Sequence, residues 1–404
     1  MNFEERFEQS KLSLEDLESF RDDEGFIDLS RAGITLSNKS REYIGNQDRI
    51  KNWINFNGTK AIIKGESLFE GEKNYGIYAE LIVEELAKKM GIPAAHYDLV
   101  KIQDENGNVV PGVLSVSMVD RDKDERLESL HAIIGDQPNN PKQQSDTTGF
   151  EFSVDQLRTN LLKQGFEEDE IENLILDYKK RTAFFIRTAD ADKHIENIAF
   201  IRGKDENGNS TIRLSPVFDS ESALLMDISK TTIDKLMDDG IALLQTVGGI
   251  YPRICVCKTK NEGGLEEPWA DTLETLIEDD ELYDYINDVM NSPIDMDEIL
   301  DSVENRIKAK LPNQVREITK AAFNFRGDEI EQVMDGTYLE LHEKSKKTGN
   351  PLLESLINKS EKADVTTTDF SSLFETLGLK MNFGNPNRDK MDSNDREFDD
   401  WEYN

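Results

Sequence analysis

A long amphipathic helix that runs directly into a short polar loop constrains the fold of this chain more than any other feature. In "EIENLILDYKKRTAFFIRTAD", apolar side chains recur at helical spacing between Ile171 and Ile186, which predicts a helix with one buried face. The loop "ADADKHIENIAF" follows at once and carries Asp192, His194 and Asn197 just before an apolar run. This placement leaves two interpretations open, an exposed polar loop or the centre of an active site.

Two short apolar runs after the loop predict a β-hairpin. Residues 198–202 and 211–215 flank the turn-forming stretch "GKDENGNS". Antiparallel pairing returns the chain to the end of the hairpin at which it began. The next segment, "SPVFDSESAL", therefore brings Asp219 close to Asn197. We expect these two side chains and Asp192 to converge, which favours the active-site interpretation.

The three converging side chains supply the groups that phosphoryl transfer needs. Carboxylate and amide oxygens are ligands that Mg²⁺ favours, and phosphate oxygens and water complete its six ligands. Two of the three groups can hold the metal. The third, Asp192, lies nearest the end of the preceding helix and can accept a proton from an attacking hydroxyl. Because catalysis of phosphoryl transfer consists mostly of positioning and charge neutralisation, the pattern predicts a phosphotransferase site.

The first third of the chain predicts a β-rich unit with one prominent helix. The strand-like runs "GFIDLS", "RIKNWINF" and "KAIIKGE" precede the helical pattern of "NYGIYAELIVEELAKKMGIPAA", and "HYDLVKIQ" with "VVPGVLSVSMVD" predicts a hairpin. Asn57-Gly58 is a turn signal because both residues tolerate positive φ. Lys64 ends an apolar strand, and Glu80 lies in the first turns of the helix. A strand lysine paired with a helix glutamate is how kinase-type folds fix nucleotide phosphates.

Three segments together resemble the HipA-like serine/threonine kinases. "DKHIEN" matches the D-x-H-x-x-N catalytic loop of this family, and "LSPVFDSESAL" looks like its metal-binding segment. "AIIKGE", followed by "YAELIVEELAKKMGIPAA", is similar to the strand lysine and the following helix of the family's small lobe. The resemblance covers roughly residues 40–225, with the motifs in matching order.

The resemblance implies a role for each matching residue. Asp192 would be the catalytic base that orients or deprotonates the acceptor hydroxyl, and Asn197 and Asp219 would hold Mg²⁺. Lys64 would contact the phosphates of ATP, and Glu80 would steady Lys64. ATP and Mg²⁺ are therefore the expected cofactors.

Further positions follow from the same resemblance. His194 would be structural and would tie the catalytic loop to its surroundings by hydrogen bonds. The backbone of segment 115–119, including Ser117 and Val119, would meet the adenine as a hinge. The chain has no G-x-G-x-x-G loop over the phosphates, and the candidate cover is "YIGNQDRIKNW", with Gly45 in its turn.

One position departs from the family pattern. The small polar pair that usually precedes the catalytic aspartate is here Asp190-Ala191, which adds a second carboxylate. That extra charge could bind a second metal or could weaken phosphate binding by repulsion.

The implied fold is α+β, a bilobal protein-kinase-like fold with a small β-rich N-lobe and a large, mainly helical C-lobe. We expect an N-terminal arm at residues 1–25, the small lobe at 26–120 and the large helical lobe at 121–380. The remaining residues, 381–404, are polar and acidic, and we expect them to form a disordered tail.

The charge balance restricts the partners. The chain has 48 basic and 82 acidic residues, a formal net charge of −34. Direct binding to nucleic acid or to an anionic membrane needs a basic surface, so we expect neither. No apolar run approaches the roughly 20 residues of a membrane helix. The start of the chain lacks the pattern of a signal peptide. The two cysteines fit reduced thiols, and we expect a cytoplasmic protein.

These features favour an ATP-dependent protein serine/threonine kinase that transfers the γ-phosphate to a hydroxyl with Mg²⁺. Its expected partners are a protein substrate and an antitoxin-like regulator. Phosphatidylinositol-type kinases use a similar D-x-H-x-x-N loop, so a lipid or small-molecule kinase is one alternative, although the negative charge disfavours a membrane-surface substrate. A pseudokinase binding module is the other alternative. The missing Gly-rich loop supports it, and the retained Asp192, Asn197 and Asp219 speak against it.

Overall fold

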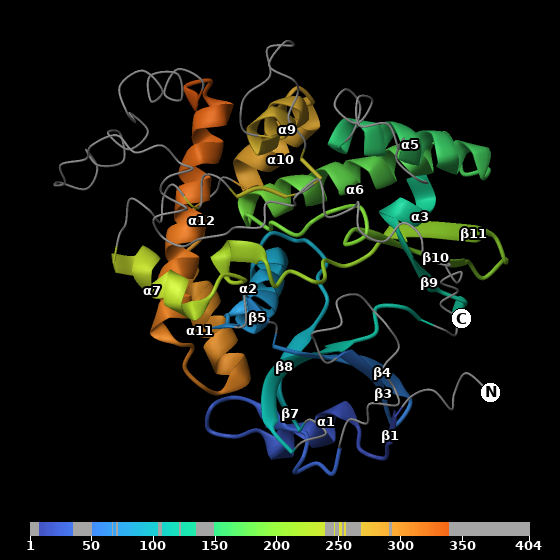
Figure 1. Cartoon of the computed structure of the whole chain (residues 1–404). Helices are drawn as coiled ribbons and strands as arrows, with labels where there is room; N and C mark the ends of the chain where they lie inside the picture. The colour runs from blue at the N-terminus through green and yellow to red at the C-terminus, as the bar shows by residue number, and fades with distance from the viewer. Residues whose placement is uncertain are drawn as a thin grey trace, which may run out of the picture. The chain divides into compact units, whose positions relative to one another are not determined.

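Figure 1 shows the computed structural model of the protein. It describes residues 8–34, 51–66, 68–69, 72–103, 107–120, 123–134, 149–238, 246, 250–252, 254–255, 268–290 and 293–338. All of these residues belong to one structural unit, Met1–Tyr338. The predicted phosphate cover around Gly45 and the predicted tail 381–404 lie outside the described residues.

A six-stranded sheet forms most of the first lobe (Figure 1). In spatial order its strands are β1 (Glu8–Ser10), β3 (Lys51–Phe56), β4 (Thr59–Gly65), β8 (Val109–Val116), β7 (Tyr97–Gln103) and β2 (Ile27–Asp28). The edge strands β1 and β2 pair in parallel with β3 and β7, and the four inner strands pair antiparallel. In the β3–β4 turn, Asn57 has φ 46° and Gly58 has φ 98°, which confirms the predicted Asn-Gly hairpin.

One face of this sheet packs against the N-terminal segment of the chain. Successive strand residues point to opposite faces, so alternate side chains of β3 and β4 reach this core. Its buried members are Leu17, Ile27, Leu29, Ile34, Ile54, Phe56, Ala61, Ile63, Val100, Ile102 and Leu114. Leu17 comes from α1 (Leu14–Leu17), a short helix whose first turn is capped by Ser13. Of the segment 1–25 expected as an arm, residues 8–10 form the edge strand β1, and Leu12, Leu14, Leu17 and Phe20 pack against the small-lobe sheet.

Helix α2 (Gly76–Lys89) lies at the border between the sheet and the helical part of the chain (Figure 1). Ten of its 14 residues are buried, because it packs both against β7 and against α11 (Met296–Ile307). The helix stops where Gly91 takes a left-handed φ of 69°, as its sequence predicts. A separate two-stranded sheet, β5 (Leu68–Phe69) with β6 (Glu72–Lys73), precedes α2.

The second lobe is mainly helical. Besides α11 it contains α3 (Leu130–Ile134), α5 (Phe150–Lys163), α6 (Glu168–Arg187), α7 (Lys230–Asp238), α9 (Pro268–Ile277), α10 (Asp280–Tyr285), α12 (Asn313–Met334) and the helical turns η5 (Ala223–Leu225) and η7 (Ile286–Met290). Helix α6 is the predicted amphipathic helix. A β-rich first lobe with one long helix and a mainly helical second lobe confirm the predicted α+β fold.

The hairpin that follows the polar loop belongs to a three-stranded sheet. Its strand order is β11 (Ser210–Leu214), β10 (Ala199–Lys204) and β9 (Arg126–Ser129). The β10–β11 pair is antiparallel, with Phe200 opposite Leu214, which confirms the predicted hairpin. The N–H of Ser215 donates to the carbonyl of Ala199 at 2.9 Å, so the chain leaves the hairpin two residues from Asn197.

A buried arginine fixes the end of α6 at which the polar loop begins. Arg187 donates to the carbonyls of Met290 (3.0 Å) and Phe323, and its guanidinium lies 3.7 Å from the centroid of the Phe323 ring. Helix α12 passes this close because Gly327 has no side chain: a Cβ there would lie 2.6 Å from the Arg187 guanidinium. The loop therefore starts from a firmly packed helix end.

Candidate active site

Lys64 is the point at which the small lobe meets the polar groups of the helical lobe. It lies on β4, opposite Lys51 of β3 and Val113 of β8, so its backbone is held on both sides. Its Nζ is 2.5 Å from Oδ1 of Asp219 and 3.6 Å from Oε1 of Glu80. The side chain of Lys64 is only 8% exposed. Two carboxylates from different elements therefore share one buried ammonium.

Glu80 projects from the buried face of α2. Its Oε2 accepts a hydrogen bond from the backbone N–H of Ser220 at 2.8 Å, and its side chain is 1% exposed. Burial raises the pKa of Glu80, and the charges of Asp219 and Glu221 raise it further, while the Lys64 ammonium lowers it. Lys64, together with the backbone N–H of Ser220, thus favours the ionised form of this carboxyl.

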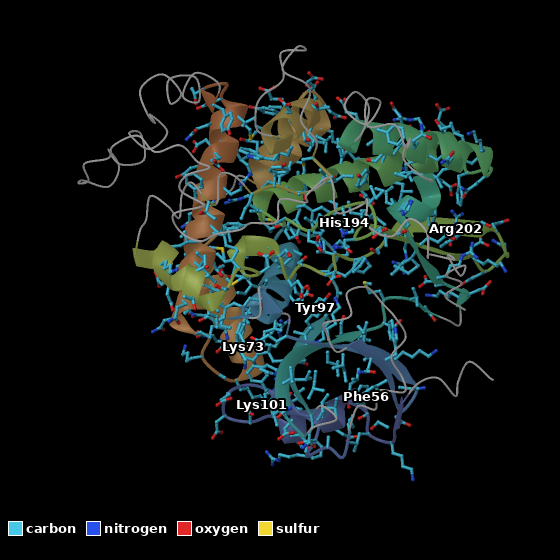
Figure 2. The ribbon with its side chains drawn as sticks, viewed as in Figure 1. Phe56, Lys73, Tyr97, Lys101, His194 and Arg202 are labelled. Carbon is cyan, nitrogen blue, oxygen red and sulfur yellow. The ribbon has the colours of Figure 1, made fainter. Side chains whose placement is uncertain are left out.

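The backbone of Asp219 adopts an uncommon conformation. Its φ of 56° lies in the left-handed region, which non-glycine residues seldom occupy and which recurs at functional sites. Its N–H donates to the hydroxyl of Tyr97 at 3.0 Å, and Tyr97 comes from β7 (Figure 2). Burial, together with the charges of Glu80 and Asp219, raises the pKa of Tyr97 well above its ordinary value, so the phenol stays protonated.

The polar loop brings Asn197 and Asp192 into direct contact. Nδ2 of Asn197 donates to the backbone carbonyl of Asp192 at 2.9 Å and to its Oδ2 at 3.0 Å. The side chain of Asp192 is 44% exposed, whereas Asn197 is half-buried. The amide nitrogen orients the carboxylate, and this leaves the amide oxygen of Asn197 as the atom suited to a cation.

His194, labelled in Figure 2, makes several contacts within the same loop. Its N–H donates to the carbonyl of Asp192 at 3.1 Å, and its own carbonyl accepts the N–H of Asn197 at 2.9 Å. Its Nδ1 accepts the N–H of Glu196 at 3.2 Å, and its Nε2 lies 3.7 Å from Oδ1 of Asp192. These contacts agree with the structural role expected for His194, and that role stays a prediction.

Sequence reasoning missed Lys193, the residue next to Asp192. Lys193 is fully buried, and its Nζ donates to the carbonyls of Phe218 and Asp219, both at 2.6 Å. The same Nζ lies 3.3 Å from Oδ2 of Asp190, which is also fully buried. Burial raises the pKa of the Asp190 carboxyl, and the Lys193 charge opposes that rise.

The extra carboxylate of the sequence motif thus has a partner inside the protein. Asp190 and Lys193 stand three residues apart, and both side chains are fully buried. The i, i+3 spacing of opposite charges was the one signal in the sequence that pointed to this pair.

The predicted hinge continues the sheet for part of its length. Ser115 is opposite Tyr97 and Ile62, and the N–H of Ser117 donates to the carbonyl of Lys60 at 2.9 Å. The N–H of Ser117 is therefore engaged with β4. Val119 lies beyond β8 and is half-buried. Contacts of this segment with adenine stay a prediction.

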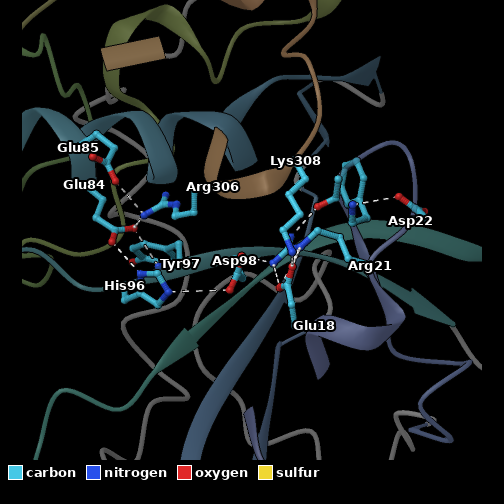
Figure 3. Close-up of polar contacts among 12 residues, drawn as sticks. Glu18, Arg21, Asp22, Glu84, Glu85, His96, Tyr97, Asp98, Arg306 and Lys308 are labelled. Atoms are coloured by element: carbon cyan, nitrogen blue, oxygen red, sulfur yellow. Dashed lines mark hydrogen bonds and ion pairs between the residues drawn. The ribbon is translucent and has the colours of Figure 1, made fainter. Parts of the chain in front are cut away.

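A charged network joins α2 to α11 and to the N-terminal segment (Figure 3). Nη1 of Arg306 on α11 lies 2.8 Å from Oε2 of Glu84 and 3.2 Å from Oε1 of Glu85, both on α2. Nδ1 of His96 lies 2.7 Å from Oε1 of Glu84. Glu84 is one helical turn beyond Glu80, so the network holds the helix that carries Glu80.

A second branch of the network anchors the N-terminal segment. Nη2 of Arg21 lies 2.6 Å from Glu18 and 3.0 Å from Asp98 of β7, while Nζ of Lys308 lies 2.6 Å from Glu18 (Figure 3). The Arg21 and Lys308 contacts lower the pKa of Glu18 to about 2. This branch connects the sheet to the end of α11.

The donor atoms at the centre of the site suit Mg²⁺ bound to a nucleotide. Within the described residues no group of three or more His, Cys, Asp or Glu side chains could hold a metal ion by itself. The amide oxygen of Asn197 and the carboxylate of Asp219 are hard oxygen ligands, and Mg²⁺ commonly takes one or two protein ligands with substrate phosphates and water. The residues present therefore fit a magnesium–nucleotide complex.

The β-rich lobe, the helical lobe and the buried lysine that meets two carboxylates between them define a protein of protein-kinase-like fold. The chain belongs to the HipA-like C-terminal domain family, whose model matches residues 27–249. This match confirms the predicted resemblance, and membership of the family supports a kinase function.

Two solved structures are similar to the chain at low identity. The Helicobacter pylori proinflammatory kinase CtkA is 14% identical with a TM-score of 0.49, and the match covers 74% of this chain and 95% of that one. HipA of Shewanella oneidensis MR-1, in a toxin–antitoxin complex with HipB and operator DNA, is 14% identical with a TM-score of 0.33, covering 77% and 71%. Both scores are below 0.5, so the assignment rests on the family match. No curated protein matches the chain.

Proposed function

We propose that this chain is an ATP-dependent protein kinase that transfers the γ-phosphate to a serine or threonine hydroxyl. The observation that carries the proposal is the position of Lys64, whose ammonium lies 3.6 Å from Glu80 and 2.5 Å from Asp219. A buried lysine with a helix carboxylate on one side and a candidate metal ligand on the other is the arrangement that fixes nucleotide phosphates in kinases.

The two lobes contribute different parts of the proposed chemistry. Lys64 neutralises phosphate charge, and Glu80 keeps its ammonium in place. Asn197 and Asp219 hold Mg²⁺, which when bound neutralises charge on the phosphate oxygens. Ser117, Val119 and Gly45 remain the proposed contacts for the rest of the nucleotide.

Asp192 acts on the acceptor in this proposal. Its carboxylate is 44% exposed, so an incoming hydroxyl can reach it. The amide of Asn197 donates to Oδ2 of Asp192 at 3.0 Å, which fixes the orientation of the carboxylate. Asp192 then accepts a hydrogen bond from the hydroxyl, and finally its proton, as phosphoryl transfer proceeds.

The charge of the chain supports a protein substrate over a nucleic acid or a membrane lipid, because a net charge of −34 repels anionic polymers and surfaces. Within the described residues no helix is long and apolar enough to span a membrane. We further propose a cytoplasmic location, an antitoxin-like regulator as partner, and lobes bounded at residues 26–120 and 121–380.

Phosphate transfer from labelled ATP tests the proposed function. The protein is incubated with Mg²⁺ and γ-labelled ATP, alone and with a cell lysate, beside the variants Asp192→Ala and Asp219→Ala. Label in protein with the parent and none with either variant is the expected result.

Other outcomes point to the alternatives. Label in the lipid extract would favour a kinase of the phosphatidylinositol type. ATP binding by the parent without any transfer would favour a pseudokinase, and the absence of both would reject the nucleotide site altogether.

A further inference from the structure

Three side chains from three different elements hold the backbone at Asp219 and Ser220. The hydroxyl of Tyr97, on β7, accepts the N–H of Asp219 at 3.0 Å. The carboxylate of Glu80, on α2, accepts the N–H of Ser220 at 2.8 Å. The ammonium of Lys193, in the polar loop, donates to the carbonyl of Asp219 at 2.6 Å. Three of the four polar backbone groups of the two residues thus have a side-chain partner from elsewhere in the chain, and the carbonyl of Ser220 accepts the N–H of Ala223 at 3.1 Å.

Unlike Tyr97 and Glu80, Lys193 comes from the polar loop. It stands next to Asp192 and four residues before Asn197, so it belongs to the loop that carries the other two proposed functional groups. Its ammonium bridges two successive carbonyls, those of Phe218 and Asp219. The connection fixes the segment of the candidate metal ligand relative to the loop of the candidate base.

The backbone of Lys193 is itself held in place. Its N–H donates to the carbonyl of Asp190 at 3.4 Å, and its carbonyl accepts the N–H of Ile254 at 2.8 Å. An ammonium buried in the interior needs an opposite charge, because transfer of an unpaired ion out of water is very unfavourable. Oδ2 of Asp190, at 3.3 Å, supplies that charge.

We propose that Lys193 is a positioning residue that sets the carboxylate of Asp219 against Asp192 and Asn197, with Asp190 as its charge-balancing partner. The left-handed backbone at Asp219 is an uncommon conformation that persists only where the surroundings hold it. Charge-assisted hydrogen bonds to its carbonyl and to the preceding one hold it directly. The inference rests on the proposed function only where it concerns Mg²⁺.

A purely structural ion pair is the competing explanation, and a pair of variants separates the two. Lys193→Met removes the ammonium and leaves Asp190 buried without its opposite charge. The double variant Asp190→Asn with Lys193→Met removes both charges, which for a buried pair is far less harmful than removing one. The double variant should therefore recover stability under either explanation, because no charge is left buried without its counter-charge, but it still lacks the donor to the two carbonyls.

Hydrogen exchange of the amides of Asp219 and Ser220 is the primary measurement, with the amides of α6 (Glu168–Arg187) as internal reference. We expect exchange at both positions to be faster by about tenfold or more in both Met variants, in line with the loss of charge-assisted hydrogen bonds. Unfolding in urea provides the stability of each variant. The expected pattern is recovery of the unfolding midpoint in the double variant without recovery of local protection.

The proposal is overturned if the double variant protects Asp219 and Ser220 as well as the parent does. If neither Met variant folds, the variant Asp190→Asn alone tests the positioning role, because it keeps the ammonium of Lys193. It should then lower the unfolding midpoint while leaving the relative exchange at Asp219 and Ser220 unchanged, and a rise of about tenfold there would contradict the proposed role.

Binding of ATP gives a second readout. The Mg²⁺ concentration that half-saturates ATP binding should rise about tenfold in the double variant, since the carboxylate of Asp219 is no longer held in place. An unchanged Mg²⁺ requirement would limit Lys193 to a structural role. If the parent protein binds no ATP, the proposed function fails, while the exchange measurement still decides what Lys193 does.

Discussion

The ammonium of Lys64 and the carboxylate of Asp219 lie 2.5 Å apart although 155 positions separate them in the sequence. Lys64 belongs to the small-lobe sheet, and Asp219 follows the hairpin of the helical lobe. A hydrogen bond of this kind between two charged groups is stronger than one between neutral groups. The contact therefore brings the proposed phosphate-binding and metal-binding groups of the two lobes to a single point.

Replacing Lys64 by methionine tests whether this contact is needed for phosphate transfer. Lys64→Met should reduce phosphate transfer by about 100-fold or more, because it removes the positive charge next to the phosphates. Its cost in the free energy of unfolding should be about 1–3 kcal/mol, the cost of leaving a buried polar partner unpaired. Glu80 can limit that cost by taking up a proton, since burial already raises its pKa. Initial rates and urea unfolding measure the two effects.

Lys88→Met is a matched control, because the same substitution there removes a lysine that is 78% exposed at the end of α2. Both the rate and the unfolding free energy should stay within error of the parent. Equal losses of transfer in the two variants would show that general charge, and not the position of Lys64, matters.

The contacts of Asn197 lead to a second prediction. Asn197→Asp replaces the amide that donates to Oδ2 of Asp192 at 3.0 Å by a second carboxylate. Two carboxylates this close repel each other, and one of them is driven to take up a proton. We expect phosphate transfer at neutral pH to fall by about 100-fold, in the range typical for a disturbed general base.

The chain offers a control of the same geometry away from the site. In the β10–β11 turn, Nδ2 of Asn209 donates to Oδ2 of Asp205 at 2.8 Å on the protein surface. Asn209→Asp should therefore leave the transfer rate unchanged. A similar loss of rate in both variants would argue against a direct role for Asn197.

Local patterns in the sequence were enough to predict the parts of the site that depend on chain neighbours. The Asn57-Gly58 turn, the hairpin after Asn197 and the helix that carries Glu80 each follow from residue type and spacing, and all three are present. Antiparallel pairing then predicts, without any tertiary information, that Asp219 lies near Asn197, and that proximity stays a prediction. These elements were predictable because local interactions determine them.

The contacts made by side chains across the fold were not predictable in the same way. Spacing does not tell whether Lys193 points to solvent or inward, because a loop has no regular period. The hydroxyl of Tyr97 reaches Asp219 over 122 positions, and nothing in the strand pattern "HYDLVKIQ" indicates such a contact. Leu17 lies in the segment expected to form an N-terminal arm, and only the fold reveals that it packs on the sheet.

The network at His96 predicts a dependence of stability on pH. The pKa of His96 is raised overall. The hydrogen bond to Glu84 at 2.7 Å and the charge of Asp98 raise it, and they outweigh burial and the charge of Arg306, which lower it. A pKa that is higher in the folded state means that the protonated imidazole stabilises the fold. This contribution is complete below the unfolded pKa of about 6.5 and is lost as the pH rises through the folded pKa.

Urea unfolding of the parent and of His96→Gln at a series of pH values measures this effect as a difference. The difference in unfolding free energy should shrink as the pH rises above about 6.5. The side chain of His96 is 52% exposed, and solvent screens its charge. The difference in unfolding free energy should therefore stay well below about 1.4 kcal/mol per pKa unit. Glu84→Gln should flatten the curve, and a difference that grows with pH would contradict the assignment.

Gly112 links the packing of the sheet to the position of Lys64. A Cβ at Gly112 would collide with the backbone carbonyl oxygen of Lys64 on the neighbouring strand and would lie 2.8 Å from Cδ1 of Ile102. The backbone of a central strand cannot move aside as a surface side chain can. We therefore expect Gly112→Ala to lower the unfolding free energy by about 1–3 kcal/mol, as overpacking does.

The same substitution should also slow phosphate transfer, because β4 must shift and carry Lys64 away from Asp219. Gly203→Ala provides the comparison: it also lies in a strand, but its new Cβ would meet a side-chain atom, Cγ of Glu125, at 3.0 Å, and not the backbone of a neighbouring strand. Its cost should be smaller, with no change in transfer rate. An unchanged transfer rate in Gly112→Ala would show that the close approach of β8 to β4 does not constrain Lys64. A loss of transfer in Gly112→Ala but not in Gly203→Ala would tie the rate to the position of that ammonium.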